Sequence, residues 1–174
     1  MVAALALLSA ASYGQTPISS LPYYLTSPGA YVVTQDVSTG GIAIIINSAN
    51  VTLDFNGHIL TCTNPLWSTG VLVNQVRNVR IKNGTLTGFL NGIVFNNPSQ
   101  IASNSSGHFV EEMHITKFTY FGIEAEYATG CVISEQLHQC QQSERAWQQQ
   151  LPRSRHCRGR RSTRYCVALV LILN

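Results

Sequence analysis

The sequence predicts an all-β fold in which short strands stack in parallel as the chain coils, and three observations predict it. Charged residues make up 11% of the 174 residues, against roughly 25% in a typical soluble domain. A phrase that ends in Asn-Gly occurs twice, as "NVTLDFNG" at 50–57 and "NVRIKNG" at 78–84. A second phrase, Gly followed by alternating apolar residues, recurs between copies of the first. Repeats of roughly 20 to 50 residues are typical of stacked architectures.

The chain begins with an apolar run, "MVAALALLSAA", which ends in small residues and is followed by the polar "SYGQTP". This is the pattern of the hydrophobic region and cleavage zone of a secretory signal peptide. A buried first helix is the alternative, although the run is short and Pro17 follows it. We therefore predict a signal-peptide-like segment at 1–14 and a secreted or cell-surface protein.

Two strand types then alternate along the chain. The first starts after Asn50 and after Asn78, and a weaker copy starts at Met113 as "MHITKF". The second type is "TGVLVN" at 69–74, "NGIVFN" at 91–96 and "FGIEAE" at 121–126. Each strand alternates with period two and is bounded by Asn, Gly, Ser or Pro, so helical repeats are excluded.

A strand this short cannot bury its apolar face alone. If each turn of the chain lies roughly 4.8 Å above the last, equivalent strands pair in parallel and their inward residues form columns. The repeats predict three such columns, which are Val51–Val79–Met113, Leu53–Ile81–Ile115 and Val71–Ile93–Ile123.

The Asn-Gly pairs at 56–57 and 83–84 are expected at sharp corners between sheets. Gly and Asn tolerate the positive φ that such a corner demands. Stacked Asn side chains can also donate hydrogen bonds to one another along the stacking direction.

These phrases carry a resemblance to a known family. The stretch "SPGAYVVTQDVSTGGIAIIINSANVTLDFNGHIL", followed by "NVRIKNGTLTGFLNGIVFNN", resembles the opening coils of secreted right-handed parallel β-helix proteins of the pectate-lyase-like superfamily. The resemblance covers residues 22 to about 134. It implies a right-handed parallel β-helix, a solenoid of about three to four coils, at 15–135.

The resemblance also implies a function, which is binding or processing of an extracellular polysaccharide along the exposed face of a sheet. An enzyme of this kind would be a polysaccharide lyase or a glycoside hydrolase. The alternative is a non-catalytic surface, adhesion or structural repeat module. The family's catalytic motifs are not matched, because "RIK" at 80–82 lacks the clustered aspartates that accompany it in such hydrolases.

The candidate site residues lie on outward columns of the predicted sheets. On the second sheet Asn74, Asn96 and Glu126 form one column, and Glu124 lies beside it. Glu124 and Glu126 share a face because they are two residues apart on a strand. Two such carboxylates could act as acid and base in glycoside hydrolysis, or bind Ca²⁺ against an acidic sugar. Solvated surface carboxylates are the alternative.

The first sheet offers two further candidates for substrate contacts, Arg80 and His114, which the predicted register stacks near Thr52. The same register places Lys82 beside Asp54 as a surface ion pair. The five cysteines show no metal-binding spacing such as C-x-x-C, so no cofactor or metal site is predicted from them.

The charge distribution excludes a nucleic-acid footprint on the patterned part of the chain. Four basic and seven acidic residues precede residue 140, and seven of the eleven Lys and Arg residues follow it. No segment between the first run and residue 165 is apolar enough to span a membrane.

The pattern ends abruptly near residue 135. Residues 136–166 are rich in Gln, Arg, Cys and His and lack period-two strands. We expect either a disordered basic tail at 136–174 or a reading-frame shift, and a shift would mean that the native protein has further coils, possible catalytic residues and a cap beyond this point. The final "VALVLILN" is expected to be a strand or a sticky end.

Overall fold

The computed structural model describes residues 14–134, 137–140 and 169–172. Within them the regular elements are β strands, apart from one 3₁₀ turn, η1 (Ala102–Asn104), so the predicted all-β class is confirmed. The predicted signal-peptide-like segment lies outside the described residues except for Gly14. No helix in the described part of the chain is long and apolar enough to cross a membrane.

The strands form two sheets in which every pairing is parallel. The longer path of the first sheet runs β1 (Thr16–Ile18), β3 (Gly29–Val33), β6 (Val51–Asp54), β9 (Val79–Thr87), β11 (Phe109–Phe118) and β13 (Val132–Ser134). Off this path, β4 (Val37–Thr39) pairs with β7 (Ile59–Cys62), which pairs with β9, and β14 (Leu137–Cys140) pairs with β11. The second sheet runs β2 (Tyr23–Leu25), β5 (Ile44–Ile46), β8 (Thr69–Asn74), β10 (Asn91–Asn96), β12 (Phe121–Glu126) and β15 (Leu169–Ile172).

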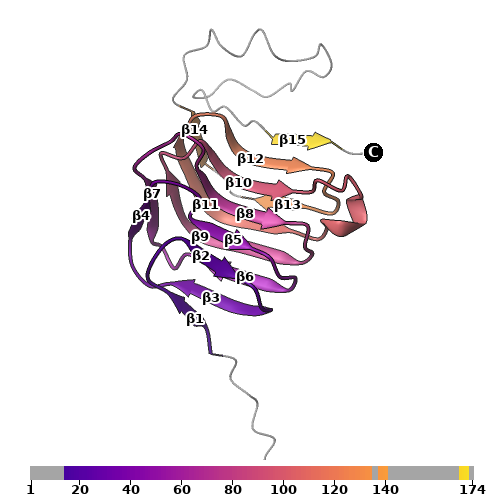
Figure 1. The fold of residues 1–174 in the computed structure, drawn as a ribbon, viewed down its shortest axis with the longest axis horizontal. Coiled ribbons are helices and arrows are strands. Elements are labelled where there is room, and N and C mark those ends of the chain that lie inside the picture. The colour runs from indigo at the N-terminus through magenta and orange to yellow at the C-terminus, as the bar shows by residue number, and fades with distance from the viewer. Residues whose placement is uncertain (1–13, 135–136, 141–168, 173–174) are drawn as a thin grey trace, which may run out of the picture.

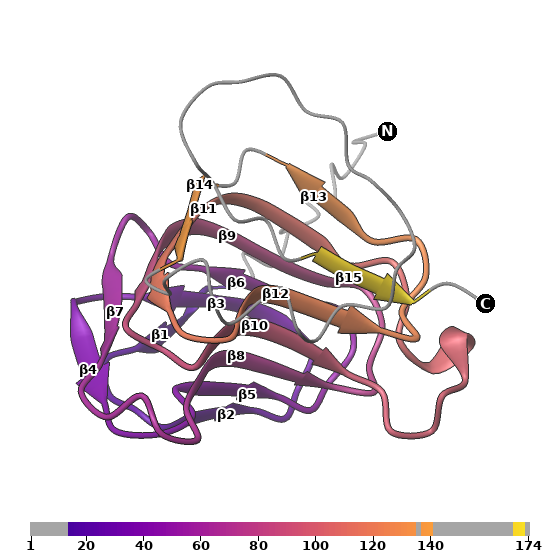
Figure 2. The same ribbon diagram turned by 90° about the horizontal axis from the view of Figure 1, so that it is seen from above.

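The chain passes back and forth between these sheets, so strands that pair with each other are never consecutive in the described part of the chain, and successive passes stack along the molecule (Figure 1). Seen from above, the strands of each sheet lie over one another (Figure 2). This arrangement of parallel sheets is consistent with a β-helix-like fold. Among the described strands, β1 stands at one end of the first sheet, and its Pro17 is exposed.

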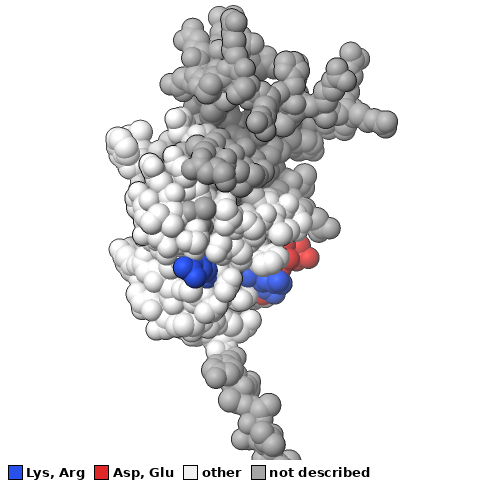
Figure 3. Space-filling model, turned by 90° about the vertical axis from the view of Figure 1, so that its right-hand side faces the viewer, with Lys and Arg blue, Asp and Glu red and all other residues white. Residues whose placement is uncertain are grey.

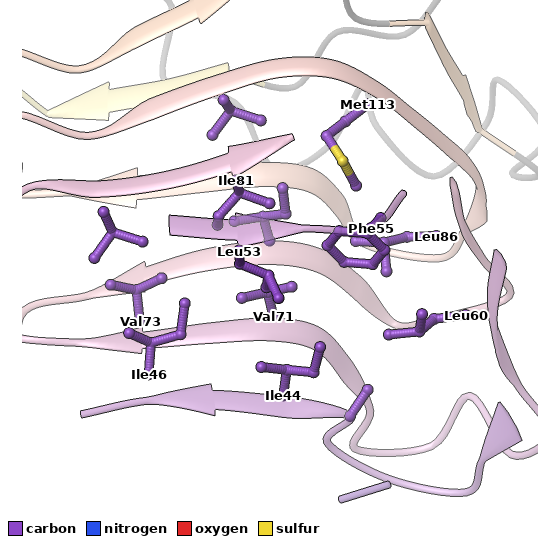
Figure 4. Close-up of a cluster of buried hydrophobic side chains, with 14 of the residues drawn as sticks. Ile44, Ile46, Leu53, Phe55, Leu60, Val71, Val73, Ile81, Leu86 and Met113 are labelled. Carbon is purple, nitrogen blue, oxygen red and sulfur yellow. The ribbon is translucent and has the colours of Figure 1, made fainter. Parts of the chain in front are cut away.

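The core lies between the two sheets, where side chains from both meet (Figure 4). It is aliphatic and aromatic, and its fully buried members include Ile44, Ile46, Leu53, Phe55, Leu60, Val71, Val73, Ile81, Leu86 and Met113. Each strand contributes alternate residues because successive side chains point to opposite faces.

The predicted inward columns are confirmed where the repeated phrases are most alike. Val51 pairs with Val79, and Leu53 pairs with Ile81. On the second sheet the predicted column Val71–Ile93–Ile123 is confirmed in full.

The predicted positions of Met113 and Ile115 are wrong. Ile81 pairs with Val110, whereas Met113 pairs with Gly84 and Ile115 pairs with Leu86. The reason is that β11 begins at Phe109, four residues before the expected copy of the phrase, and stacks along the whole of β9. Met113 and Ile115 are buried, so their inward direction was predicted correctly and only their register was not.

The Gly of the second phrase makes room for the opposite sheet. A Cβ atom on Gly70 would lie 2.8 Å from Leu86 Cδ1, and one on Gly92 would lie 2.5 Å from Ile115 Cγ2. Gly70 and Gly92 have no positive φ and pair through neighbouring positions on β8 and β10. The same Cβ atoms would lie even closer to the next strand of their own sheet, the one on Gly70 at 2.7 Å from the Gly92 carbonyl oxygen and the one on Gly92 against the Gly122 carbonyl oxygen. These glycines are therefore needed for close packing within and between the sheets and not for a turn.

The prediction that both Asn-Gly pairs lie at corners between sheets is wrong, because residues 56–57 separate β6 from β7 within the first sheet and residues 83–84 lie inside β9. The backbone of the two pairs also differs. Asn56 and Gly57 both have positive φ, of 51° and 78°, as predicted. In the second pair Asn83 has a φ of 60°, but Gly84 does not have positive φ. A Cβ on Gly84 would overlap the side chain of Phe55, so the prediction of a turn glycine is wrong there and the cause is core packing.

Two short segments of the expected irregular tail are strands. β14 pairs with β11, and β15 pairs with β12. The last strand of a parallel sheet presents unpaired N–H and C=O groups, and these segments satisfy part of that edge. The remaining residues after 134 lie outside the described part of the chain.

Candidate functional site

A surface pocket of about 190 Å³ opens where β10 and β12 end and the loop at 97–108 begins. Its lining consists of Val94, Phe95, Asn96, Asn97, Pro98, Gln100, Glu124 and Tyr127. Two of the predicted site residues, Asn96 and Glu124, therefore meet at one pocket.

The register of the second sheet brings these two residues together. Val94 pairs with Leu72 on one side and with Glu124 on the other, as predicted. Asn96 pairs with Asn74, also as predicted. Because Phe95 between them is buried in the core, Val94 and Asn96 face outward on the strand.

A ladder of three Asn side chains leads to the pocket. The amide Nδ2 of Asn74 donates to Oδ1 of Asn47 at 2.9 Å, and Nδ2 of Asn96 donates to Oδ1 of Asn74 at 3.1 Å. Each bond holds the next amide in a defined orientation. Asn96, the last member, is exposed at the rim of the pocket, so the ladder presents a fixed amide to a ligand.

The wall of the pocket is held by Asn97, which is 4% exposed. Its Nδ2 donates to the carbonyl oxygen of Tyr127 at 2.7 Å and to that of Ile101 at 3.0 Å, and its Oδ1 accepts a hydrogen bond from Ser99 at 2.8 Å. This one side chain joins the loop to the end of β12. The wall of the pocket is therefore held in place by hydrogen bonds within the protein. In the sequence, the only feature that could have pointed to Asn97 as a functional residue is its position directly after a strand.

His108 lies beneath the pocket at the other end of the loop and is fully buried. Its ring stacks on Phe95, with centroids 4.5 Å apart and 24° between the planes. Nε2 lies 3.0 Å from the Ser105 hydroxyl, and Nδ1 has no protein hydrogen-bond partner. Burial lowers the pKa of His108 to about 4, so the ring is neutral at pH 7.

The pairing of Glu124 with Glu126 as two catalytic carboxylates stays a prediction. Glu124 is half-buried on β12 and lines the pocket. Glu126 is the last residue of that strand, and its backbone pairs with Ile172. Its side chain lies outside the described part of the structure.

The two predicted candidates on the first sheet, Arg80 and His114, do not lie on neighbouring positions. Arg80 pairs with Thr52 as expected, but it contacts Glu111 through an ion pair of 3.1 Å and lies 5.1 Å from the ring centre of Phe109. His114 pairs with Thr85, so the prediction that it stacks on Arg80 is wrong. The cause is the same early start of β11 that displaces Met113.

The predicted ion pair between Lys82 and Asp54 is confirmed at 3.1 Å. Burial disfavours ionisation of Asp54, but hydrogen bonds from the Asn56 N–H, Lys82 and Asn83 outweigh it and lower the pKa. This pair is a local surface contact on the first sheet, distant in sequence from the pocket.

The electrostatics of the pocket are simple. Among the described residues that line it, Glu124 is the one charged side chain. The face on which η1 lies shows few charged side chains among the described residues (Figure 3). Nowhere in residues 14–134, 137–140 and 169–172 do three or more His, Cys, Asp or Glu side chains gather as metal ligands.

Comparison with protein-family models, with curated proteins and with solved structures finds no match for this chain.

Proposed function

We propose that this chain is a secreted right-handed parallel β-helix protein that binds an extracellular polysaccharide, with one sugar residue seated in the pocket at the ends of β10 and β12. The observation that carries the proposal is the Asn47–Asn74–Asn96 ladder, which ends beside Glu124 in that pocket. The extended second sheet would support the rest of the glycan.

The polar groups of the pocket suit sugar hydroxyls. A hydroxyl donates one hydrogen bond and accepts others, and the amides of Asn96 and Gln100 offer both kinds of partner. The Glu124 carboxylate accepts hydrogen bonds only. Tyr127 and Val94 add apolar surface for the carbon–hydrogen face of a sugar ring.

The charge of the pocket favours a neutral sugar over an acidic one. A uronate would bring its carboxylate toward the Glu124 carboxylate, and the other described residues of the lining are uncharged. A neutral glycan meets no such penalty. We therefore place acidic polysaccharides second among the ligands.

The residues that line the pocket favour binding of a glycan without cleavage. Hydrolysis of a glycosidic bond ordinarily uses two carboxyl groups that flank it. Glu124 is the one carboxylate lining the pocket in the described part of the chain. A surface-binding module needs only the groups that line the pocket, whereas a hydrolase would also need Glu126, on the same face of β12, as its second carboxylate.

The test is a binding titration of the full chain against neutral and acidic polysaccharides, with an assay for new reducing ends and for ultraviolet-absorbing unsaturated products. We expect neutral glycans to bind without either product. The double variant N96A/E124Q should lose most of this binding, while T52A on the first sheet should retain it. Equal binding by wild type and N96A/E124Q would overturn the assignment of the pocket, and release of either product would overturn the binding-only function.

A further inference from the structure

A second groove lies between β4 and β7, far from the pocket described above. It has a volume of about 260 Å³ and is lined by Asp36, Val37, Ser38, Ile59 and Thr61. Figures 1 and 2 both place β4 and β7 on the side of the molecule opposite η1. The groove therefore cannot be a lobe of the pocket at the ends of β10 and β12.

The carboxylate of Asp36 is held in a fixed position at one end of this groove. Its Oδ1 accepts a hydrogen bond from the Ile59 N–H at 2.9 Å, and Nδ1 of His58 lies 3.1 Å from the same oxygen. The Ile59 N–H first, and then His58, lower the pKa of Asp36 below its usual range. An ionised, oriented acceptor is thus present on an otherwise exposed side chain.

Hydroxyl groups continue from the carboxylate along the sheet. Ser38 pairs with Thr61, Thr61 pairs with Thr87, and Thr87 pairs with Thr116. Leu60 and Leu86, which directly precede Thr61 and Thr87 on their strands, are fully buried. The hydroxyls therefore face outward, because successive side chains point to opposite faces of a sheet. They follow one another at the spacing of parallel strands, roughly 4.8 Å.

We propose that this groove is a second glycan-binding site, which takes a vicinal diol of a neutral pyranose residue. The Asp36 carboxylate accepts the two O–H donors, and the Ser38 and Thr61 hydroxyls donate to or accept from their neighbours. Ile59, which is 39% exposed, supplies an apolar contact for the ring face. The proposal goes beyond the pocket of β10 and β12 and does not depend on it.

The lining argues against other ligand classes. An anion would meet the Asp36 carboxylate, and the described residues that line the groove include no Lys or Arg to offset that repulsion. A metal cation would find one carboxylate and no group of three His, Cys, Asp or Glu ligands in the described part of the chain. A neutral polyol matches the mixture of one acceptor, two hydroxyls and an aliphatic surface.

The experiment uses the ¹⁵N-labelled full chain and follows backbone amide shifts during titration with millimolar maltotriose, cellotriose or mannotriose, and with trigalacturonate as the acidic probe. We expect at least one neutral probe to shift the amides of Ser38, Ile59 and Thr61, and trigalacturonate to leave them unchanged. S38Y fills the groove from an exposed position and should abolish these shifts. T26Y, the same change at an exposed loop position, should retain them.

This experiment tests the two proposed sites independently. N96A/E124Q should remove shifts at the pocket of β10 and β12 and leave those at Ile59. The second site is overturned if no neutral probe moves the three amides, if trigalacturonate moves them, or if S38Y responds as wild type does. Shifts confined to Ser38, Ile59 and Thr61 would overturn the proposed pocket instead and leave the groove as the glycan site.

Discussion

Acidification should destabilise the protein through His108, and the structure sets the size of the effect. Burial lowers the pKa of this imidazole from 6.5 to about 4. In the unfolded chain the same ring takes up its proton near pH 6.5. Between these two values the unfolded state binds more protons than the folded state, so the free energy of unfolding falls as the pH falls through this window.

The magnitude follows from the distance between the two pKa values. Each pH unit is worth about 1.4 kcal/mol, so lowering the pH from above 6.5 to below 4 should cost about 3 kcal/mol. This is a large share of the roughly 5–15 kcal/mol that stabilises a typical domain. The loss should level off below pH 4, where both states are protonated at this ring.

Urea unfolding at several pH values between 4 and 7 measures this slope. The variant H108F retains an aromatic ring against Phe95 but cannot be protonated, so its free energy of unfolding should lose the slope that His108 causes. The lowered pKa values of Asp36 and Asp54 should leave a smaller slope near pH 4. H114Q removes an exposed His and should keep the wild-type slope. The comparison uses the slope of the free energy of unfolding against pH, because H108F will also change the absolute stability. A wild-type slope in H108F would refute the reasoning.

Three further substitutions test the packing and the surface contacts. G92A should destabilise the fold by about 2 kcal/mol or more in urea unfolding, because the added Cβ would lie 2.5 Å from Ile115 Cγ2. The control G41A should be nearly neutral, because no atom lies within 4 Å of the added Cβ. N74A breaks both bonds of the Asn ladder and should cost about 1–2 kcal/mol by the same measurement. K82A removes a partly exposed ion pair and should change the free energy of unfolding by less than about 1 kcal/mol, an effect that added salt should reduce further.

The sequence was sufficient for the strand class, the parallel pairing and most of the inward columns. Val51 and Val79 occupy the same place in two copies of one phrase, and identical surroundings in sequence lead to stacked positions in space. The register of Ile115 was not predictable in this way. Its strand alternates with period two over two segments, "FV" and "MHI", and alternation alone does not say which segment stacks on Ile81.

The pocket was predictable only in its strand residues. Glu124 and Asn96 follow from the alternation of β10 and β12, since their outward direction is fixed once Phe95 and Ala125 point inward. Asn97 and His108 lie in an insertion with no period, and their burial depends on how the loop folds back over the strand ends. A sequence pattern reports which face a strand residue occupies, but it does not report the path of a loop.

Pro17 also gives the two ends of the first sheet different chemistry. This residue has no N–H, so the outer rim of β1 lacks one donor that an incoming strand would need. Growth of a fibre by addition of molecules at this rim should therefore be disfavoured. At high concentration, molecules that assemble through β-pairing should add at the other end of the first sheet more readily than at β1. The variant P17V should reduce this difference between the two ends.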